Sequence, residues 1–158
     1  MTEPTAIHAS FTLERRYPYP PARVFAAFAD PVLKARWFSG PDGWTPIERS
    51  CAFHEGGRER AVGRWPNGLV TDFDAIYHDI VADRRIVYSY AMRLDDRRIS
   101  VSLATIEILP DGAGTRLIVT EQGAFLDGYE DNGSREHGTG DLLDRMAASP
   151  AAEPSAFA

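Results

Sequence analysis

The sequence contains a single cysteine, Cys51, among its 158 residues. One thiol can form neither an intrachain disulfide nor a metal site built from several cysteines, so both of these are excluded. The four histidines, at positions 8, 54, 78 and 137, lack the spacing typical of metal ligands, and we expect no metal. There is also no G-x-S-x-G segment, so an acyl-transfer triad has no support. We expect no cofactor.

A surplus of positive charge is also missing, because the formal net charge is −6. Such a chain is poorly suited to phosphate backbones or anionic lipid surfaces, so we expect neither a nucleic-acid nor a membrane partner. No stretch approaches the ~20 apolar residues of a membrane-spanning helix. The N-terminal residues lack the basic region and apolar run of a secretory signal. These features predict a cytoplasmic protein.

The first forty residues predict one strand and two short helices. Residues 8–17 are rich in strand-forming side chains and end just before a proline. Pro21 suits the first turn of a helix, and Asp30 followed by Pro31 suits the cap and first turn of a second one. Gly40 marks the end of this helical pair. The expected apolar flank of the pair comprises Val24, Phe25, Phe28, Val32, Leu33, Trp37 and Phe38.

From residue 45 onward the apolar residues alternate with a period of two, which is typical of strands. The expected strands are 46–54, 57–65, 69–80, 84–92, 97–109 and 114–123. The short, turn-forming segments between them favour antiparallel neighbours over parallel crossovers. A last helix is expected around 134–148, followed by a frayed tail at 149–158.

This order of elements predicts a single α+β domain. Seven strands and one long helix bury an apolar face only if the sheet curls around the helix. A sheet wrapped around a helix leaves a hollow between them, and hollows lined by aromatic side chains bind small molecules.

Several segments resemble the START-like (SRPBCC) superfamily, which has the helix-grip fold. They are PPARVFAAFADPVLKARWFSG at 20–40, Gly56-Gly57, DIVADRRIVYSY at 79–90, GAGTRLIVTEQGAF at 112–125 and HGTGDLLDRMAA at 137–148. The branch that they resemble is the bacterial one named after the C-terminal domain of the activator of the large heat-shock chaperone's ATPase. The resemblance implies one helix-grip domain over residues 8–148. Many relatives carry a tryptophan early in the last helix, where this chain has Gly140-Asp141, and that departure bears on the shape of the hollow.

The resemblance implies three kinds of function. The first is the binding of a small hydrophobic or amphipathic molecule in the central hollow, which is our leading hypothesis. The second is an enzyme of the polyketide cyclase or dehydratase type, for which Glu121, Tyr88 and Arg60 are the candidate acid–base residues. The third is a module that assists a chaperone; it has the weakest support, because the chain lacks the additional N-terminal domain of the eukaryotic activators.

Alternation along the strands selects the side chains that line the hollow. Glu121 shares a face with apolar residues, and an inward carboxylate needs a partner, water or a ligand. Arg60 or Arg64 could supply that partner, and we favour Arg60. Gly138 lies either in the loop or inside the last helix, where its missing side chain would leave space. The expected lining is Phe28, Trp37, Phe38, Trp65, Phe73, Tyr77, Tyr88, Tyr90, Glu121, Gly138, Thr139 and Leu142.

Overall fold

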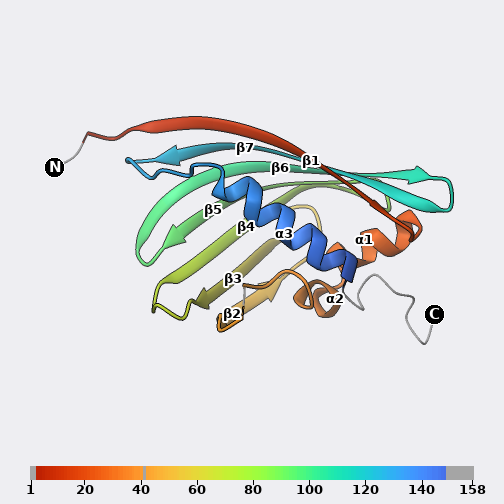
Figure 1. Cartoon of the computed structure of the whole chain (residues 1–158), viewed down its shortest axis with the longest axis horizontal. Helices are drawn as coiled ribbons and strands as arrows, with labels where there is room; N and C mark the ends of the chain where they lie inside the picture. The colour runs from red at the N-terminus through yellow and green to blue at the C-terminus, as the bar shows by residue number, and fades with distance from the viewer. Residues whose placement is uncertain (1–2, 41, 149–158) are drawn as a thin grey trace.

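The computed structural model describes residues 3–40 and 42–148, which form seven strands and three helices (Figure 1). The expected tail at 149–158 lies outside the described residues. The strands are β1 (Ala6–Tyr17), β2 (Thr45–Cys51), β3 (Arg58–Arg64), β4 (Val70–Val81), β5 (Arg85–Leu94), β6 (Arg97–Asp111) and β7 (Gly114–Leu126). The helices are α1 (Pro21–Ala29), α2 (Pro31–Ala35) and α3 (Ser134–Ala148).

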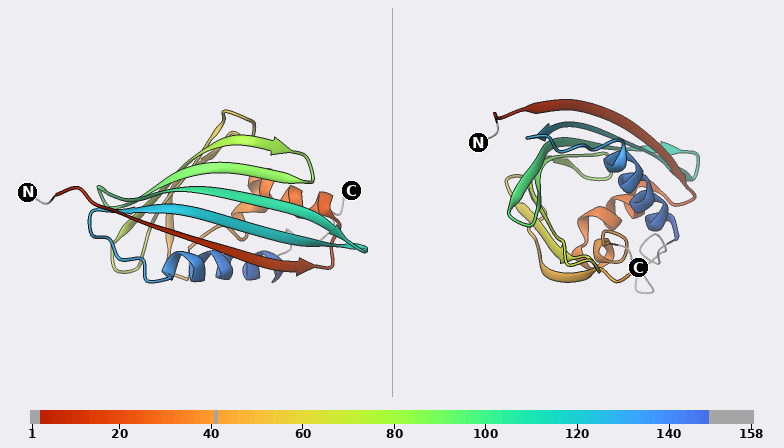
Figure 2. Two further views of the ribbon diagram at one scale, coloured as in Figure 1. Left: turned by 90° about the horizontal axis from the view of Figure 1, so that it is seen from above. Right: turned by 60° about the vertical axis from the view of Figure 1, so that its left-hand side comes forward.

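All seven strands belong to one antiparallel sheet with the order β1-β7-β6-β5-β4-β3-β2. Strands β2 to β7 follow one another as hairpins, and β1 joins the sheet beside β7. The sheet curls around α3, as the two further views show (Figure 2). The predicted fold is therefore confirmed, and each strand boundary lies within three residues of its expected position.

The two short helices connect β1 to β2. The Asp30 side chain accepts hydrogen bonds from the backbone N–H groups of Val32 and Leu33, so the predicted cap of α2 is present. However, α2 ends at Ala35, and Trp37 and Phe38 follow it rather than belong to it. The predicted apolar flank is also wrong at one point, because Val32 is exposed.

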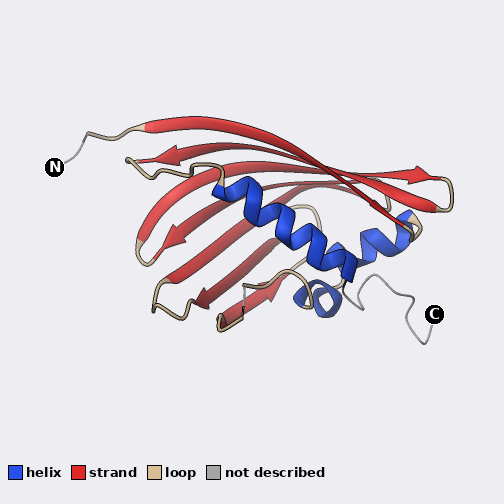
Figure 3. Ribbon diagram, in the orientation of Figure 1, coloured by secondary structure: helices blue, strands red, loops and turns tan. Residues whose placement is uncertain are grey.

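The apolar core lies between the sheet and the helices, which are all on the same side of the sheet (Figure 3). Helix α3 is held by its C-terminal half, where Leu143 and Met146 are buried. The buried Tyr17 hydroxyl donates a hydrogen bond to the Leu143 carbonyl and ties α3 to β1. No helix in the described part of the chain is long and apolar enough to cross a membrane.

Candidate functional site

Strand register brings the chemically interesting side chains into rows across the inner face of the sheet. One row runs from Phe11 through Glu121, Ala104 and Tyr88 to Tyr77. The next row comprises Ala9, Gly123, Ser102, Tyr90, Ala75 and Glu59, and the third comprises Phe125, Ser100, Met92, Phe73, Ala61 and Arg49. Tyr88, Tyr90, Phe73 and Phe125 each have an alanine or a serine beside them, which leaves room for their rings.

Aromatic rings form a continuous layer over the middle of these rows. Phe73 contacts Phe38, Tyr88 and Tyr90, with ring centroids 5.1, 6.3 and 4.8 Å apart. Tyr88 also contacts Tyr77 at 5.7 Å. These offset and edge-on arrangements are favourable for aromatic pairs. Phe73, Tyr77 and Tyr90 are buried in this layer, whereas Phe38 and Tyr88 are half-buried.

A buried polar cluster lies at one side of this layer. Lys34 of α2 and Glu59 of β3 are only 5% and 2% exposed, and their side chains form an ion pair of 2.6 Å. The Tyr77 hydroxyl donates to the same carboxylate oxygen, and the Lys34 ammonium also contacts that hydroxyl at 3.3 Å. Burial together with the negative charge of Glu59 raises the pKa of Tyr77 well above its usual range. Tyr77 therefore stays protonated.

A second polar cluster lies at the opposite side. The Tyr90 hydroxyl donates to Glu121 at 2.5 Å and accepts from the Arg135 guanidinium at 3.0 Å. Arg135, from the first turn of α3, also donates to Ser100 at 2.8 Å. Burial raises the pKa of Glu121 even though Tyr90 and Arg135 act in the opposite direction. Glu121 can therefore hold a proton at a pH where an ordinary glutamate is ionised.

Tyr88 lies between these two clusters, at the middle of the sheet. Its neighbours in the row, Tyr77 and Ala104, are almost completely buried, yet Tyr88 itself is only half-buried. Within residues 3–40 and 42–148, no protein group hydrogen-bonds to its hydroxyl. Burial, and then the charge of Glu121, raise the pKa of Tyr88 well above its usual range. The inner face thus presents a protonated hydroxyl without a hydrogen-bond partner among the described residues.

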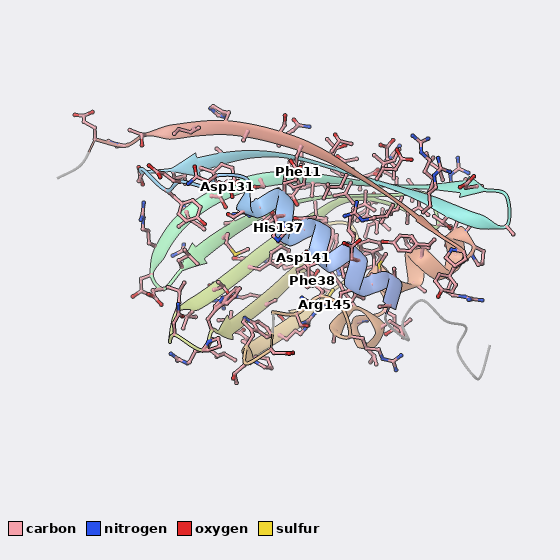
Figure 4. All side chains as sticks on the ribbon, in the orientation of Figure 1. Phe11, Phe38, Asp131, His137, Asp141 and Arg145 are labelled. Carbon is pink, nitrogen blue, oxygen red and sulfur yellow. The ribbon has the colours of Figure 1, made fainter. Side chains whose placement is uncertain are left out.

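A small pocket of about 20 Å³ opens beside the second polar cluster, between the inner face of the sheet and the start of α3. Its lining is Ala9, Phe11, Ser102, Glu121, Gly123, Phe125, Asp131 and Arg135. Figure 4 shows Phe11 and Asp131 near the first turn of α3, whereas Phe38 and Arg145 lie toward its other end. The pocket has room for about one water molecule, so a larger guest requires side chains to move.

Most of the predicted lining residues do lie on the inner side of the sheet. Phe28 and Trp37 are buried and pack edge to face at 5.1 Å, and the Trp37 indole donates to the Ala27 carbonyl. Leu142 packs against the core from α3, and Thr139, one turn earlier, is half-buried. Phe38, Phe73, Tyr77, Tyr88, Tyr90 and Glu121 form the aromatic layer and its polar edges.

Three of the predicted site residues lie elsewhere. Arg60 points outward and pairs with Asp72 and Glu48, because its position on β3 has the parity of the outer face. The partner of Glu121 is the Tyr90–Arg135 pair instead. Gly138 lies inside α3, which was one of the two predicted alternatives, but it faces solvent rather than the sheet. Trp65 lies in the turn after β3, where its indole donates to Thr71, outside both apolar clusters.

The sequence analysis did not identify Lys34, Glu59 or Arg135. Glu59 has the same strand parity as Ala61, which was available as a signal of its inward position. Arg135 precedes Thr139 and Leu142 by four and seven residues, which is the spacing of one helical face. A lysine next to Leu33 offered no comparable signal, because its burial depends on the distant Glu59.

The outer face of the sheet carries one shallow depression. It is lined by His8, Ala9, Ser10, Ser89, Val101, Ser102, Leu103, Gln122, Gly123 and Ala124. In the described part of the chain, no group of three or more His, Cys, Asp or Glu side chains could hold a metal ion.

Comparisons with known proteins agree with the fold. The sequence of residues 18–149 matches the family described as Activator of Hsp90 ATPase homolog 1-like protein. A protein from Rhizobium leguminosarum is 41% identical, with 93% of this chain and 97% of that chain covered and a TM-score of 0.89. The Mll3558 protein from Rhizobium loti is 46% identical, with 91% and 98% covered and a TM-score of 0.85.

A more distant structure, protein CV1439 from Chromobacterium violaceum, is 27% identical, with 92% and 98% covered and a TM-score of 0.72. No curated protein matches the sequence. The family match covers most of the chain, and the similar structures come from bacteria and share the whole fold. The chain therefore belongs to the family of Activator of Hsp90 ATPase homolog 1-like proteins.

Proposed function

We propose that the protein binds a small amphipathic molecule between the inner face of the sheet and α3, and that the Tyr88 hydroxyl donates a hydrogen bond to it. The observation that carries this proposal is the absence of a protein hydrogen bond at the Tyr88 hydroxyl among the described residues. This hydroxyl is also not one of the polar atoms that the fold closes off from solvent. A ligand acceptor can therefore reach this hydroxyl and pair with it.

The surface that Tyr88 retains supports the same proposal. Both neighbours in its row are closed to solvent, so this surface faces the region between the sheet and the helix. Phe38 and Met92 are half-buried beside it, while Phe73 and Tyr90 are nearly buried. Aromatic side chains with one free polar group are typical of sites for small organic ligands.

The charges around Tyr88 define the chemistry of the group that it binds. Burial raises the pKa of Tyr88, and the charges of Glu121 and Glu59 raise it further, so its hydroxyl remains a donor. A neutral acceptor such as a ketone oxygen fits this position better than an anion, because the nearest charges are carboxylates. We therefore propose a ligand with a flat apolar body and a carbonyl-type oxygen at Tyr88.

Two probes of the same shape test this proposal. Calorimetric titration should give a dissociation constant for 2-acetylnaphthalene that is about tenfold lower than for 2-ethylnaphthalene, which has no acceptor. The substitution Tyr88→Phe should abolish this difference, because it removes only the hydroxyl. The matched control is Tyr19→Phe, since Tyr19 lies against Arg23 outside the aromatic layer, and it should leave the difference intact.

Two results would contradict the proposed site. If neither naphthalene bound saturably to the wild-type protein, ligand binding itself would be rejected. If the preference for the ketone persisted in Tyr88→Phe, the role of the hydroxyl would be rejected.

Acid–base catalysis on such a ligand is a second proposal, and the raised pKa of Glu121 favours it. Glu121 and Tyr88 lie in one row on the inner face, separated by Ala104. Arg60 has no part in it. For any reaction that the protein is found to accelerate, Glu121→Gln should lower the rate by about 10²–10⁴-fold if Glu121 transfers the proton. A rate that survived this change would exclude Glu121 as the acid or base.

A chaperone-assisting role is a third proposal, and only the chain's membership of its family supports it. It predicts that the purified protein raises the ATP hydrolysis rate of a chaperone of the Hsp90 type. We also propose that the protein acts in the cytoplasm. An unchanged hydrolysis rate over a range of protein concentrations would reject the chaperone role and leave the ligand site untouched.

A further inference from the structure

An arginine at the edge of the aromatic layer has a buried donor with no hydrogen-bond partner in the described part of the chain. Arg49 of β2 lies opposite Ala61, in the row that continues to Phe73 and Met92, so its side chain is on the inner face. Its Nη1 donates to the Phe38 carbonyl at 2.6 Å. Its Nη2 is closed to solvent and has no hydrogen-bond partner within the described residues. Leaving a charged donor unpaired in this way is costly.

The Phe38 ring lies close to two cations, one of which is the Arg49 guanidinium. The Arg49 guanidinium carbon is 5.5 Å from the ring centroid, and the Lys34 ammonium is 4.6 Å from it. Phe38 is half-buried, and its ring packs edge-on against the ring of Phe73. If the ring turned aside, the vacated position would adjoin both cations.

The charges in this region do not balance. Lys34 is already paired with Glu59, and Tyr77 stays neutral because its pKa is raised. Burial likewise raises the pKa of the nearby Cys51 thiol, which therefore remains uncharged at neutral pH. Arg49 and Lys34 therefore share the single negative charge of Glu59, and the region carries one excess positive charge. A buried charge is stabilised by a partner of opposite sign.

We infer that Arg49 forms the second polar subsite of the ligand, a subsite for a carboxylate that takes the place of the Phe38 ring. The carboxylate accepts from Arg49 Nη2 and lies near Lys34, and the apolar body of the ligand lies on Phe73 toward Tyr88. The backbone of this segment stays in place, because Arg145 of α3 donates to the Trp37 and Ser39 carbonyls while Arg49 donates to that of Phe38. Only the Phe38 side chain has to move.

This inference rests on the proposed function, because the carboxylate belongs to the same ligand. The test compares 2-naphthoate with 2-naphthamide, two probes of equal shape that differ in charge, by calorimetric titration of the full chain. Naphthoate should bind the wild-type protein at least about tenfold more tightly, as expected for a charge-assisted hydrogen bond. In Arg49→Met the two affinities should become equal. The matched control is Arg58→Met on β3, which removes the same charge from a surface pair with Asp74 and should keep the preference.

The outcomes separate the two proposals. If both probes bind the wild-type protein with equal affinity, the carboxylate subsite is rejected and the ligand site stands. If neither binds, the subsite is rejected, and the ligand site is rejected as well only if 2-acetylnaphthalene also fails to bind. A preference for naphthoate that persists in Arg49→Met also rejects the subsite. Circular dichroism checks that Arg49→Met folds. If it does not fold, the variant Phe38→Ala tests the subsite instead. Removing the ring should increase the preference for naphthoate, and an unchanged preference would overturn the inference.

Discussion

Burying the ion pair between Lys34 and Glu59 costs free energy, because both groups lose their hydration. Breaking such a pair leaves one charge buried alone. We expect Lys34→Met to lower the free energy of unfolding by about 3–5 kcal/mol. The double variant Lys34→Met/Glu59→Leu should lose clearly less, since it leaves neither charge behind. Urea denaturation monitored by circular dichroism measures both.

The surface pair of Arg58 and Asp74 provides the control for this comparison. The side chain of Arg58 is 66% exposed and that of Asp74 is 36% exposed, so Arg58→Met should change stability by no more than about 1 kcal/mol. A double variant as unstable as Lys34→Met would contradict the assignment of the cost to an unpaired charge.

The raised pKa of Glu121 predicts that the stability of the fold depends on pH. Its pKa is raised above the ordinary value of 4.5, mainly by burial, with Asp131 acting in the same direction and Tyr90 and Arg135 opposing. The folded state therefore keeps a proton that the unfolded chain has lost, and stability falls as the pH rises from 4.5 through the raised pKa. Glu121→Gln should remove this fall. Melting temperatures between pH 4 and pH 8 measure it, with the exposed Glu130→Gln as control, and identical profiles for wild type and Glu121→Gln would contradict it.

Helix α3 differs between its two halves in sequence and in packing. Two glycines interrupt its first half, and its N-terminal turns attach to the sheet mainly through the polar contacts of Arg135. Its C-terminal half, in contrast, is anchored by Leu143 and Met146. The N-terminal half of α3 is therefore held mainly by polar contacts, and its C-terminal half by apolar ones.

The substitution Gly138→Ala should stabilise this helix. A β-carbon at Gly138 would meet no atom within 4 Å, and the residue has an ordinary helical conformation. The gain should be up to about 1 kcal/mol, or about 2–4 °C in melting temperature. The control Gly128→Ala should destabilise, because Gly128 has a φ of 79°. A lower melting temperature for Gly138→Ala would show that the glycine is needed where it stands.

The elements themselves were predictable from the sequence, because each depends on local signals. Pro21 and Asp30 mark helix starts, and alternation with turn residues marks the strands. The extent of α2 was not predictable, since the chain leaves the helix after Ala35 to place Trp37 against Phe28. The orientation of Gly138 depends on the packing of α3 against β1, which is a tertiary contact.

For the molecule as a whole, the curled antiparallel sheet around α3 also followed from the sequence, because short turns and a single long helix leave few alternatives. The polar chemistry of the interior was only partly predictable. Glu121 was identified as an inward carboxylate, yet its partner Arg135 comes from the last helix. The Lys34–Glu59 pair joins residues from α2 and β3. Pairings of this kind arise from the folded arrangement and have no local signature.

A crystal structure of the protein with 2-acetylnaphthalene would examine the interior site most directly. We expect the naphthalene to lie on Phe73 between the sheet and α3, with its ketone oxygen about 2.7 Å from the Tyr88 hydroxyl. The competing position is the depression on the outer face, between Val101, Leu103 and Gln122. A probe found there, with the interior unchanged, would contradict the proposal that Tyr88 and the aromatic layer form the ligand site.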